Sequence, residues 1–156
     1  MVGEDFYTFR GYMEKDWGHI TASMEDYIEM IYRLSLSQGF TRVNELSKSL
    51  NVQPPSATKM LHKLSELNLV IYEKYGVIML TEEGKQMGGL LLTRHNIIET
   101  FLKLISPKGD VLEQTEKIEH SLTPETIKNL NYFLDFLNKN PDIANKYNKY
   151  LMDKDM

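Results

Sequence analysis

The sequence Glu116-Lys117-Ile118-Glu119-His120 contains three side chains of the kinds that bind metal ions. In a helix, residues three and four positions apart lie on the same face, so Glu116, Glu119 and His120 would be close enough to reach one cation. The alternative interpretation is a solvated acidic face with one histidine near a helix end. The choice between them depends on what the rest of the chain supplies.

Two more acidic residues and one more histidine occur at spacings that suit a metal site. Asp26 and Glu29 are three residues apart on a predicted helix, away from its apolar stripe. They equally suit a helix start, because acidic residues favour the positive end of the helix dipole and Ser23-x-x-Asp26 approximates a capping box. His95 follows Leu91 by four residues on an apolar helix face, where a histidine is more often a hydrogen-bonded core residue than a ligand.

Apolar periodicity predicts the elements that carry these residues. A helix follows Thr21, with Ser23 as its N-cap, and ends near Gly39. Two shorter helices are predicted over residues 43–50 and 54–64, with a turn at 51–53 and the second helix opened by Pro54-Pro55. A β-hairpin around Tyr75-Gly76 follows. Two helices followed by a hairpin make a winged helix-turn-helix.

The winged segment has the charge and the side chains of a DNA-binding surface. The chain carries a net charge of −4, whereas the five basic and three acidic residues between Thr41 and Tyr75 give that segment +2. Because basic residues supply most non-specific DNA affinity, the predicted contact lies there. Solvated polar residues or a protein-docking module are the alternatives. The candidate DNA-binding residues are Pro54, Ser56, Thr58, Lys59, His62, Lys63, Lys74 and Tyr75.

The rest of the chain is predicted to be helical. A long helix runs from Thr81 to about Ile105, with its apolar stripe at Met87, Leu91, Ile98, Leu102 and Ile105. The Glu116 helix follows, and Thr123-Pro124 begins another, whose apolar seam is Ile127, Leu130, Leu134 and Leu137. This seam suits either an intrachain core or a dimer. Asn140-Pro141 ends that helix, and the polar segment that follows predicts one more.

The predicted fold is therefore mainly α, with an N-terminal winged helix-turn-helix, a two-stranded β wing and a C-terminal helical dimerisation domain. Predicted domain bounds are 1–20 for an aromatic-rich N-terminal extension, 21–83 for DNA binding, and 84–156 for metal binding and dimerisation. The chain has no cysteine, no apolar run near the ~20 residues of a membrane helix, and no signal-like start, so we expect a cytoplasmic protein.

Several runs of residues together resemble the manganese transport regulator (MntR) branch of the diphtheria toxin repressor family. These runs are Met24–Tyr32, Val52–Leu64, Ile71–Tyr75, Arg94-His95 and Ile118–His120. The resemblance extends in order from about Ser23 to Leu137. One departure concerns the wing, which has Tyr75-Gly76-Val77 where many members have an arginine before the glycine.

The resemblance implies a homodimeric repressor that binds operator DNA when loaded with metal and represses metal-uptake genes. The implied ligands, which would hold a pair of Mn²⁺ ions, are Asp26, Glu29, His95, Glu116, Glu119 and His120. Iron-responsive relatives have methionine in place of Asp26 and cysteine in place of Glu116. Carboxylate oxygens suit Mn²⁺ better than sulfur does, although other divalent transition metals can substitute. Without metal, four carboxylates brought together would repel one another.

Two other functions fit parts of the sequence. The first is a winged-helix regulator that senses a non-metal ligand, in which the acidic residues are purely structural. The second is a di-metal carboxylate enzyme, because glutamates and histidines on bundled helices also build such sites. The sequence has no Glu-x-x-His pair of the di-iron type and no cysteine nucleophile. We therefore expect a regulator without enzymatic activity.

Overall fold

The computed structural model describes residues 20–154, so all of the predicted N-terminal extension except Ile20 lies outside the described residues. Contacts between residues divide the described chain into two units, residues 20–94 and 95–154. The division falls inside the long helix α5 (Glu82–Ile105), so each unit contains part of α5. The predicted domain bounds, 21–83 and 84–156, stay a prediction.

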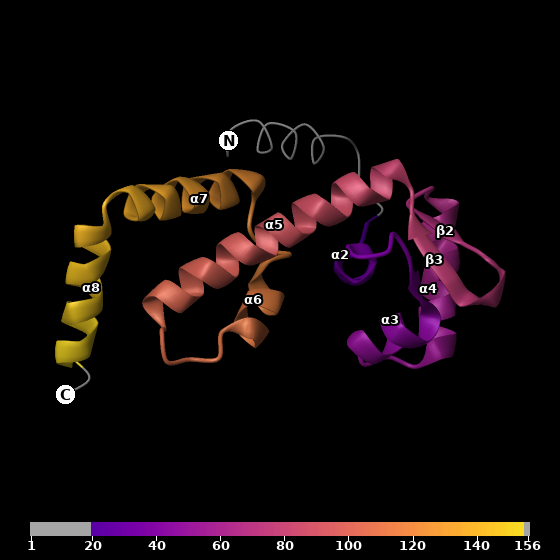
Figure 1. Cartoon of the computed structure of the whole chain (residues 1–156), viewed down its shortest axis with the longest axis horizontal. Helices are drawn as coiled ribbons and strands as arrows, with labels where there is room; N and C mark the ends of the chain where they lie inside the picture. Colours follow the sequence, from indigo (N-terminus) through magenta and orange to yellow (C-terminus); the bar gives the residue numbers. More distant parts are fainter. Residues whose placement is uncertain (1–19, 155–156) are drawn as a thin grey trace. The chain divides into compact units, whose positions relative to one another are not determined.

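Residues 20–94 form the predicted winged helix-turn-helix (Figure 1). Its elements are α2 (Ala22–Ser35), β1 (Thr41–Arg42), α3 (Val43–Ser49), α4 (Pro54–Glu66), β2 (Val70–Tyr72), β3 (Val77–Leu80) and the first half of α5. The sheet is antiparallel with strand order β1-β3-β2, so the predicted hairpin gains a third strand. A strand of two residues is too short to show an alternating pattern, which is why the sequence did not reveal β1.

The turn between α3 and α4 forms as the sequence predicts. Asn51 has a positive φ of 53°, a conformation that asparagine tolerates better than most residues do. Val52 N–H donates to Ser47 O at 2.9 Å, and Pro54 occupies the first turn of α4, where its missing N–H costs nothing. These features fix the angle at which α4 leaves α3.

The predicted start of α2 is wrong by two residues. The N-cap is Thr21, not Ser23: Thr21 has an extended backbone and its Oγ1 accepts a hydrogen bond from Met24 N–H at 3.2 Å. Ala22 favours the helical conformation, so the helix extends back to the nearest residue that can cap it. Ser23 lies inside the helix and cannot form the capping box with Asp26. A capping role no longer explains why an acidic residue stands at position 26.

The core of this unit is formed where α2, α3 and α4 pack together and onto the sheet. Its fully buried apolar side chains are Ile28, Ile31, Leu46, Ala57, Leu61, Leu64, Leu69 and Ile78. On α4 the buried side chains are Ala57, Leu61 and Leu64, whereas Met60 is half-buried. Because apolar burial is the main favourable term in folding, this core holds α2 in place without any metal ion.

The first half of α5 packs against α2 at a pair of glycines. A Cβ atom added at Gly88 would lie 2.6 Å from Tyr32 Cβ, a distance at which one of the two helices must shift. At Gly89, the added Cβ would meet the end of the same ring at 3.4 Å, which is close to ordinary contact. The absence of a side chain at Gly88 therefore permits the close approach of these two helices.

Residues 95–154 contain the rest of α5 followed by α6 (Leu112–Ile118), α7 (Pro124–Lys139) and α8 (Pro141–Lys154). Thr123 is the predicted N-cap of α7: its Oγ1 accepts from Thr126 N–H at 3.2 Å. The core of this unit consists of Ile97, Ile98, Leu102, Val111 and Ile127, with Leu130 and Leu134 packed against it. Three residues of the α7 seam thus serve the intrachain core.

Ile105, the predicted last member of the α5 stripe, is 41% exposed because α5 ends there and the chain turns away at Ser106. Among residues 20–154, no helix combines the length and apolarity needed to cross a membrane.

The glycine contact predicts unequal effects of two adjacent substitutions. Both Gly88→Ala and Gly89→Ala gain about 1 kcal/mol of helix propensity. Only the first forces overpacking against Tyr32, so we expect Gly88→Ala to be about 1–3 kcal/mol less stable than Gly89→Ala. Urea unfolding of the metal-free variants, followed by circular dichroism, measures the difference. Equal stabilities would show that the helices are not held at this contact.

Candidate metal centre

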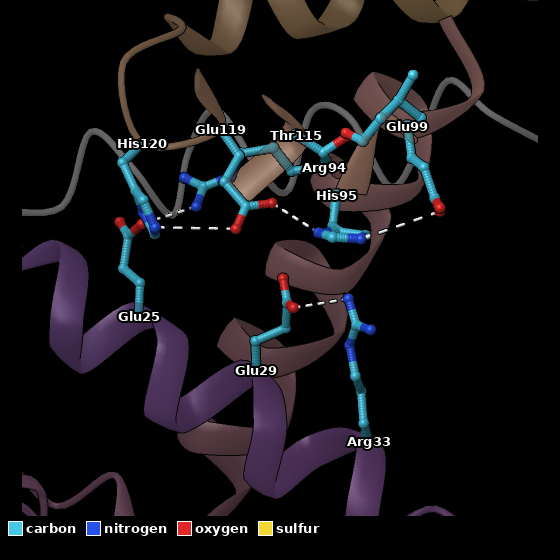
Figure 2. Close-up of polar contacts among 10 residues, drawn as sticks. Glu25, Glu29, Arg33, Arg94, His95, Glu99, Thr115, Glu119 and His120 are labelled. Carbon is cyan, nitrogen blue, oxygen red and sulfur yellow. Dashed lines mark hydrogen bonds and ion pairs between the residues drawn. The ribbon is translucent and has the colours of Figure 1, made fainter. Parts of the chain in front are cut away.

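The strongest candidate for a metal centre lies in residues 95–154, where α5 meets the end of α6. His95 Nδ1 lies 2.7 Å from Glu119 Oε2, and both side chains are 4% exposed (Figure 2). The backbone of Glu119 is held in place because its N–H donates a hydrogen bond to Thr115 O at 3.0 Å. Thr115 is itself fully buried and its hydroxyl donates to Val111 O, which anchors this turn.

The predicted helix over residues 116–120 is only partly right. Helix α6 ends at Ile118, Glu119 is its C-cap in a helical conformation, and His120 lies in the turn that follows. The helix stops because the chain must reverse before α7, and Ser121 N–H bonds to Ile118 O in a tighter turn. Glu119 and His120 are therefore held by this turn rather than by a helix face.

The contacts of Glu119 suit a cation site. His120 Nε2 lies 3.8 Å from Glu119 Oε1, so this carboxylate has an imidazole on each side. In the tautomer with a proton on Nδ1, His95 donates to Glu119 and its Nε2 keeps a lone pair for a ligand. Buried carboxylate oxygens and imidazole nitrogens form a donor set that fits a divalent transition metal.

Two more glutamates in this unit differ in their exposure to solvent. Glu116, a predicted ligand, is exposed on α6. Glu99, which the sequence analysis missed, is partly buried, with Oε2 3.9 Å from His95 Nε2 and Oε1 2.8 Å from Lys103 Nζ. The signal that could have found it is its spacing, since Glu99 follows His95 by four residues on the same helix.

The other two predicted ligands belong to α2, in residues 20–94. Asp26 is exposed, whereas Glu29 is buried and its Oε2 lies 2.7 Å from Arg33 Nη2. Figure 2 shows the Glu29 carboxylate facing the Arg33 guanidinium. Between them lies Tyr27, whose burial raises the pKa of its hydroxyl, so it stays neutral and supplies no anionic oxygen.

An ion pair that the sequence analysis did not predict stands beside the α2 carboxylates. Arg94 Nη2 donates to Glu25 Oε2 at 2.7 Å, and the arginine side chain is 4% exposed. The two residues are 69 positions apart in the chain, so only tertiary structure could reveal the pair. Removing one partner of a buried pair leaves an uncompensated charge, and the pair therefore ties α2 to α5.

The candidate DNA-binding residues lie mostly on exposed surface of α4 and the wing. Pro54, Ser56, Lys59, His62 and Lys63 are exposed, and Thr58 is half-buried. Lys74 is exposed as well.

At the tip of the wing, Tyr75 is 92% exposed and has a positive φ of 70°, which is uncommon for a bulky residue. Arg42 Nη1 donates to Tyr75 O at 3.2 Å and braces this conformation. Arg42 was not among the predicted residues, although it is a basic residue next to the helix-turn-helix.

Two family models match this chain, one after the other. The model described as "Iron dependent repressor, N-terminal DNA binding domain" matches residues 19–78. The model described as "Iron dependent repressor, metal binding and dimerisation domain" matches residues 81–148. The first range contains α2, the helix-turn-helix and most of the hairpin, and the second contains the His95–Glu119 pair.

Similar proteins carry names of the same kind. An "HTH-type transcriptional regulator MntR" from Listeria welshimeri is 42% identical over 123 residues, covering 78% of this chain and 87% of the relative. One of the same name from Lysinibacillus sphaericus is 38% identical over 127 residues, covering 81% and 91%. The solved structure titled "Structure of the manganese regulator SloR" superposes with a TM-score of 0.65 at 27% identity. That match covers 75% of this chain and 55% of the other, so the chain spans about half the length of the solved structure.

Proposed function

The chain belongs to the iron-dependent repressor family, as its resemblance to the diphtheria toxin repressor family predicted, and on this premise we propose that it is a manganese-responsive transcriptional repressor. The observation that carries the proposal is the buried His95–Glu119 pair with His120 beside it, in a chain that also has a winged helix-turn-helix. A DNA-binding unit and a cation-binding donor set in one chain are the two parts that such a repressor needs.

The proposed ligands of the metal site come from α2, α5 and α6 with the turn that follows α6. They are Asp26 and Glu29 on α2, His95 on α5, and Glu116, Glu119 and His120 at the end of α6. A bound divalent cation supplies positive charge that neutralises these carboxylates and joins the segments that carry them. His95 and His120 take part as neutral imidazoles, because a protonated ring has no lone pair to donate.

Manganese is the proposed metal because of the donor atoms and the relatives. The ligand set contains carboxylate oxygens and imidazole nitrogens and no sulfur, which suits Mn²⁺ better than a softer metal. The Listeria and Lysinibacillus relatives are named MntR, and the solved structure is titled a manganese regulator. We propose about two ions per chain, as the resemblance implies, and the donor atoms allow it: four carboxylates with two oxygens each and two imidazoles offer more than the roughly six donor atoms of one octahedral ion.

Metal binding is proposed to act on DNA affinity through α2. This helix packs in the core of the winged unit, while His95 and Glu119 belong to the other unit. Ligands from both units on the same ions would fix the winged unit relative to the rest of the chain. A dimer that reads two half-sites needs a fixed separation between its recognition helices, so ordering them before DNA is bound lowers the entropic cost of binding.

The proposed DNA surface is the exposed side of α4 with the wing. Helix α4 is the second helix of the helix-turn-helix, the position that enters the major groove in such proteins. Lys59, Lys63 and Lys74 would pair with phosphates, and Ser56, Thr58 and His62 would reach base edges. Arg42 is added to this surface because it is exposed and bonds the backbone of the wing tip.

Self-association is proposed to use an apolar face in residues 95–154. A pocket of about 330 Å³ opens there between α5, α7 and α8. Its lining includes Phe101, Ile105, Phe133, Phe136, Ile143 and Tyr147. Large exposed apolar patches commonly mark interfaces, and the second matching family model is described as a dimerisation domain.

The family is one of transcriptional regulators, so we propose no enzymatic activity, and we propose a cytoplasmic protein.

The metal proposal predicts saturable Mn²⁺ binding by the metal-stripped protein. Calorimetric titration should give about two Mn²⁺ per chain, and Mg²⁺ and Ca²⁺ should bind far more weakly. Asp26→Ala and His95→Ala should each weaken binding by about tenfold or more. Glu113→Ala removes an exposed carboxylate of α6 outside the ligand set and is the matched control, expected to bind normally. No saturable binding by the wild-type protein would refute the metal site.

The DNA proposal predicts how salt affects binding. A duplex selected from a random pool by the Mn²⁺-loaded protein serves as the probe, and fluorescence anisotropy measures its affinity. Lys59→Ala and Lys63→Ala should weaken binding and each lower the slope of log K against log salt by about 1. Lys146→Ala, which makes the same charge change on α8, should leave the slope unchanged. Equal slopes in all three variants would place the DNA contact elsewhere.

The interface proposal predicts that Phe136→Asp shifts the protein toward monomer. A carboxylate placed at the pocket would be buried without a partner in the dimer, at a cost of several kcal/mol. Sedimentation velocity measures the shift. Tyr150→Asp, on exposed surface of α8 outside the pocket lining, is the control and should remain dimeric. A Phe136→Asp variant as dimeric as wild type would rule this face out.

A further inference from the structure

We propose that Arg33 competes with the bound metal ion for Glu29 and so raises the manganese concentration at which the repressor responds. The inference rests on the proposed function, in which Glu29 is a metal ligand. Arg33 follows Glu29 by four residues on α2, and its Nη2 lies 2.7 Å from Glu29 Oε2 (Figure 2). In the metal-free protein, a guanidinium thus occupies a place beside this carboxylate that a cation would take.

The burial of the pair makes this competition strong enough to matter. The Glu29 side chain is 12% exposed and that of Arg33 is 32% exposed. A helix pair of the same spacing on α7, Lys139 with Asp135, is 72% and 44% exposed. Water and salt screen exposed pairs, which contribute little. The Glu29–Arg33 pair is less exposed to water and salt than the Lys139–Asp135 pair. Losing it on metal binding therefore costs more free energy than losing the exposed pair would.

The geometry of Arg33 also suits a partner that can be displaced. Its Nε and Nη2 atoms are buried and make no hydrogen bond among the described residues, although Nη2 is in ion-pair contact with Glu29. The contact is therefore electrostatic attraction without the aligned, bidentate hydrogen bonds that make arginine–carboxylate pairs strong. Such a pair holds the carboxylate in the absence of metal and yields when a divalent cation arrives.

Two physical outcomes are open to the arginine when metal binds, and both lower affinity. If the guanidinium moves away, the attraction to Glu29 is lost. If it stays, a positive charge remains close to a divalent cation and repels it. The observed affinity is thus reduced by the stability of the metal-free pair, as for any ligand that must displace a competitor.

The neighbouring ion pair shows why Arg33 is singled out. Arg94 pairs with Glu25, which is not a proposed ligand, so that pair can persist in both states. Arg33 pairs with Glu29, a proposed ligand, so when metal binds Arg33 either shares this carboxylate with the ion or loses the contact. Arg33 therefore links the strength of an ion pair on α2 to the metal threshold.

The experiment is a calorimetric Mn²⁺ titration of metal-stripped wild-type protein and three variants. Arg33→Gln removes the charge, Arg33→Lys keeps it, and Lys139→Gln removes the same charge from the exposed pair on α7. We expect Arg33→Gln to bind Mn²⁺ about three- to tenfold more tightly with unchanged stoichiometry. Arg33→Lys should stay within about twofold of wild type, as should Lys139→Gln. Arg33→Met, with an unbranched apolar side chain, should repeat the result of Arg33→Gln and replaces it if that variant folds poorly.

Urea unfolding of the metal-free variants separates competition from a merely structural role. Competition predicts opposite directions for Arg33→Gln: lower stability without metal and higher affinity for Mn²⁺. A structural pair predicts lower stability with unchanged or weaker affinity, which would overturn the inference. Equal tightening in Lys139→Gln would also overturn it, because net charge would then explain the gain. If the wild-type protein binds no Mn²⁺, both the proposed function and this inference are wrong. If the wild-type protein binds Mn²⁺ and the Arg33→Gln variant binds it with the same affinity, only this inference is wrong.

Discussion

A buried carboxylate needs a cation or a hydrogen-bond donor, and the candidate site residues in each of the two units depend on how that need is met. Glu25 is paired with Arg94, Glu29 with Arg33, and Glu119 with His95, each at 2.7 Å. Two features of the fold bring these partners together. The missing side chain at Gly88 lets α5 lie against α2 near Tyr32, and the turn after Ile118 places Glu119 at His95.

These contacts change how the proposed switch is understood. From the sequence, four carboxylates brought together would simply repel one another without metal. In the structure, the buried carboxylates of Glu29 and Glu119 already have partners in the chain itself, Arg33 and His95. Metal binding then exchanges one set of partners for another. The free energy of that exchange, and not repulsion alone, would set the affinity, so residues outside the ligand set contribute to the threshold.

The helical half of the chain shows one element serving two purposes. The inner side of α7 packs Ile127, Leu130 and Leu134 into the core of its own unit. Its other side leaves Phe133 and Phe136 about half exposed beside α8. The alternating three- and four-residue spacing predicted an apolar seam, but periodicity cannot distinguish a core from an interface, because both require the same apolar stripe.

Much of this protein was determined by its sequence alone. The order of helices, the turn at Asn51, the capped start of α7 at Thr123 and the family all follow from local propensities and motifs, which act over a few residues. Local rules failed where two possible caps stood two residues apart, as at Thr21 and Ser23, and where a strand was too short to show an alternating pattern, as at β1. The long-range partners of Glu25 and Glu119 were decided only by tertiary structure. Arg94 reaches Glu25 across 69 positions and His95 reaches Glu119 across 24, and no spacing rule connects residues that meet only because helices pack.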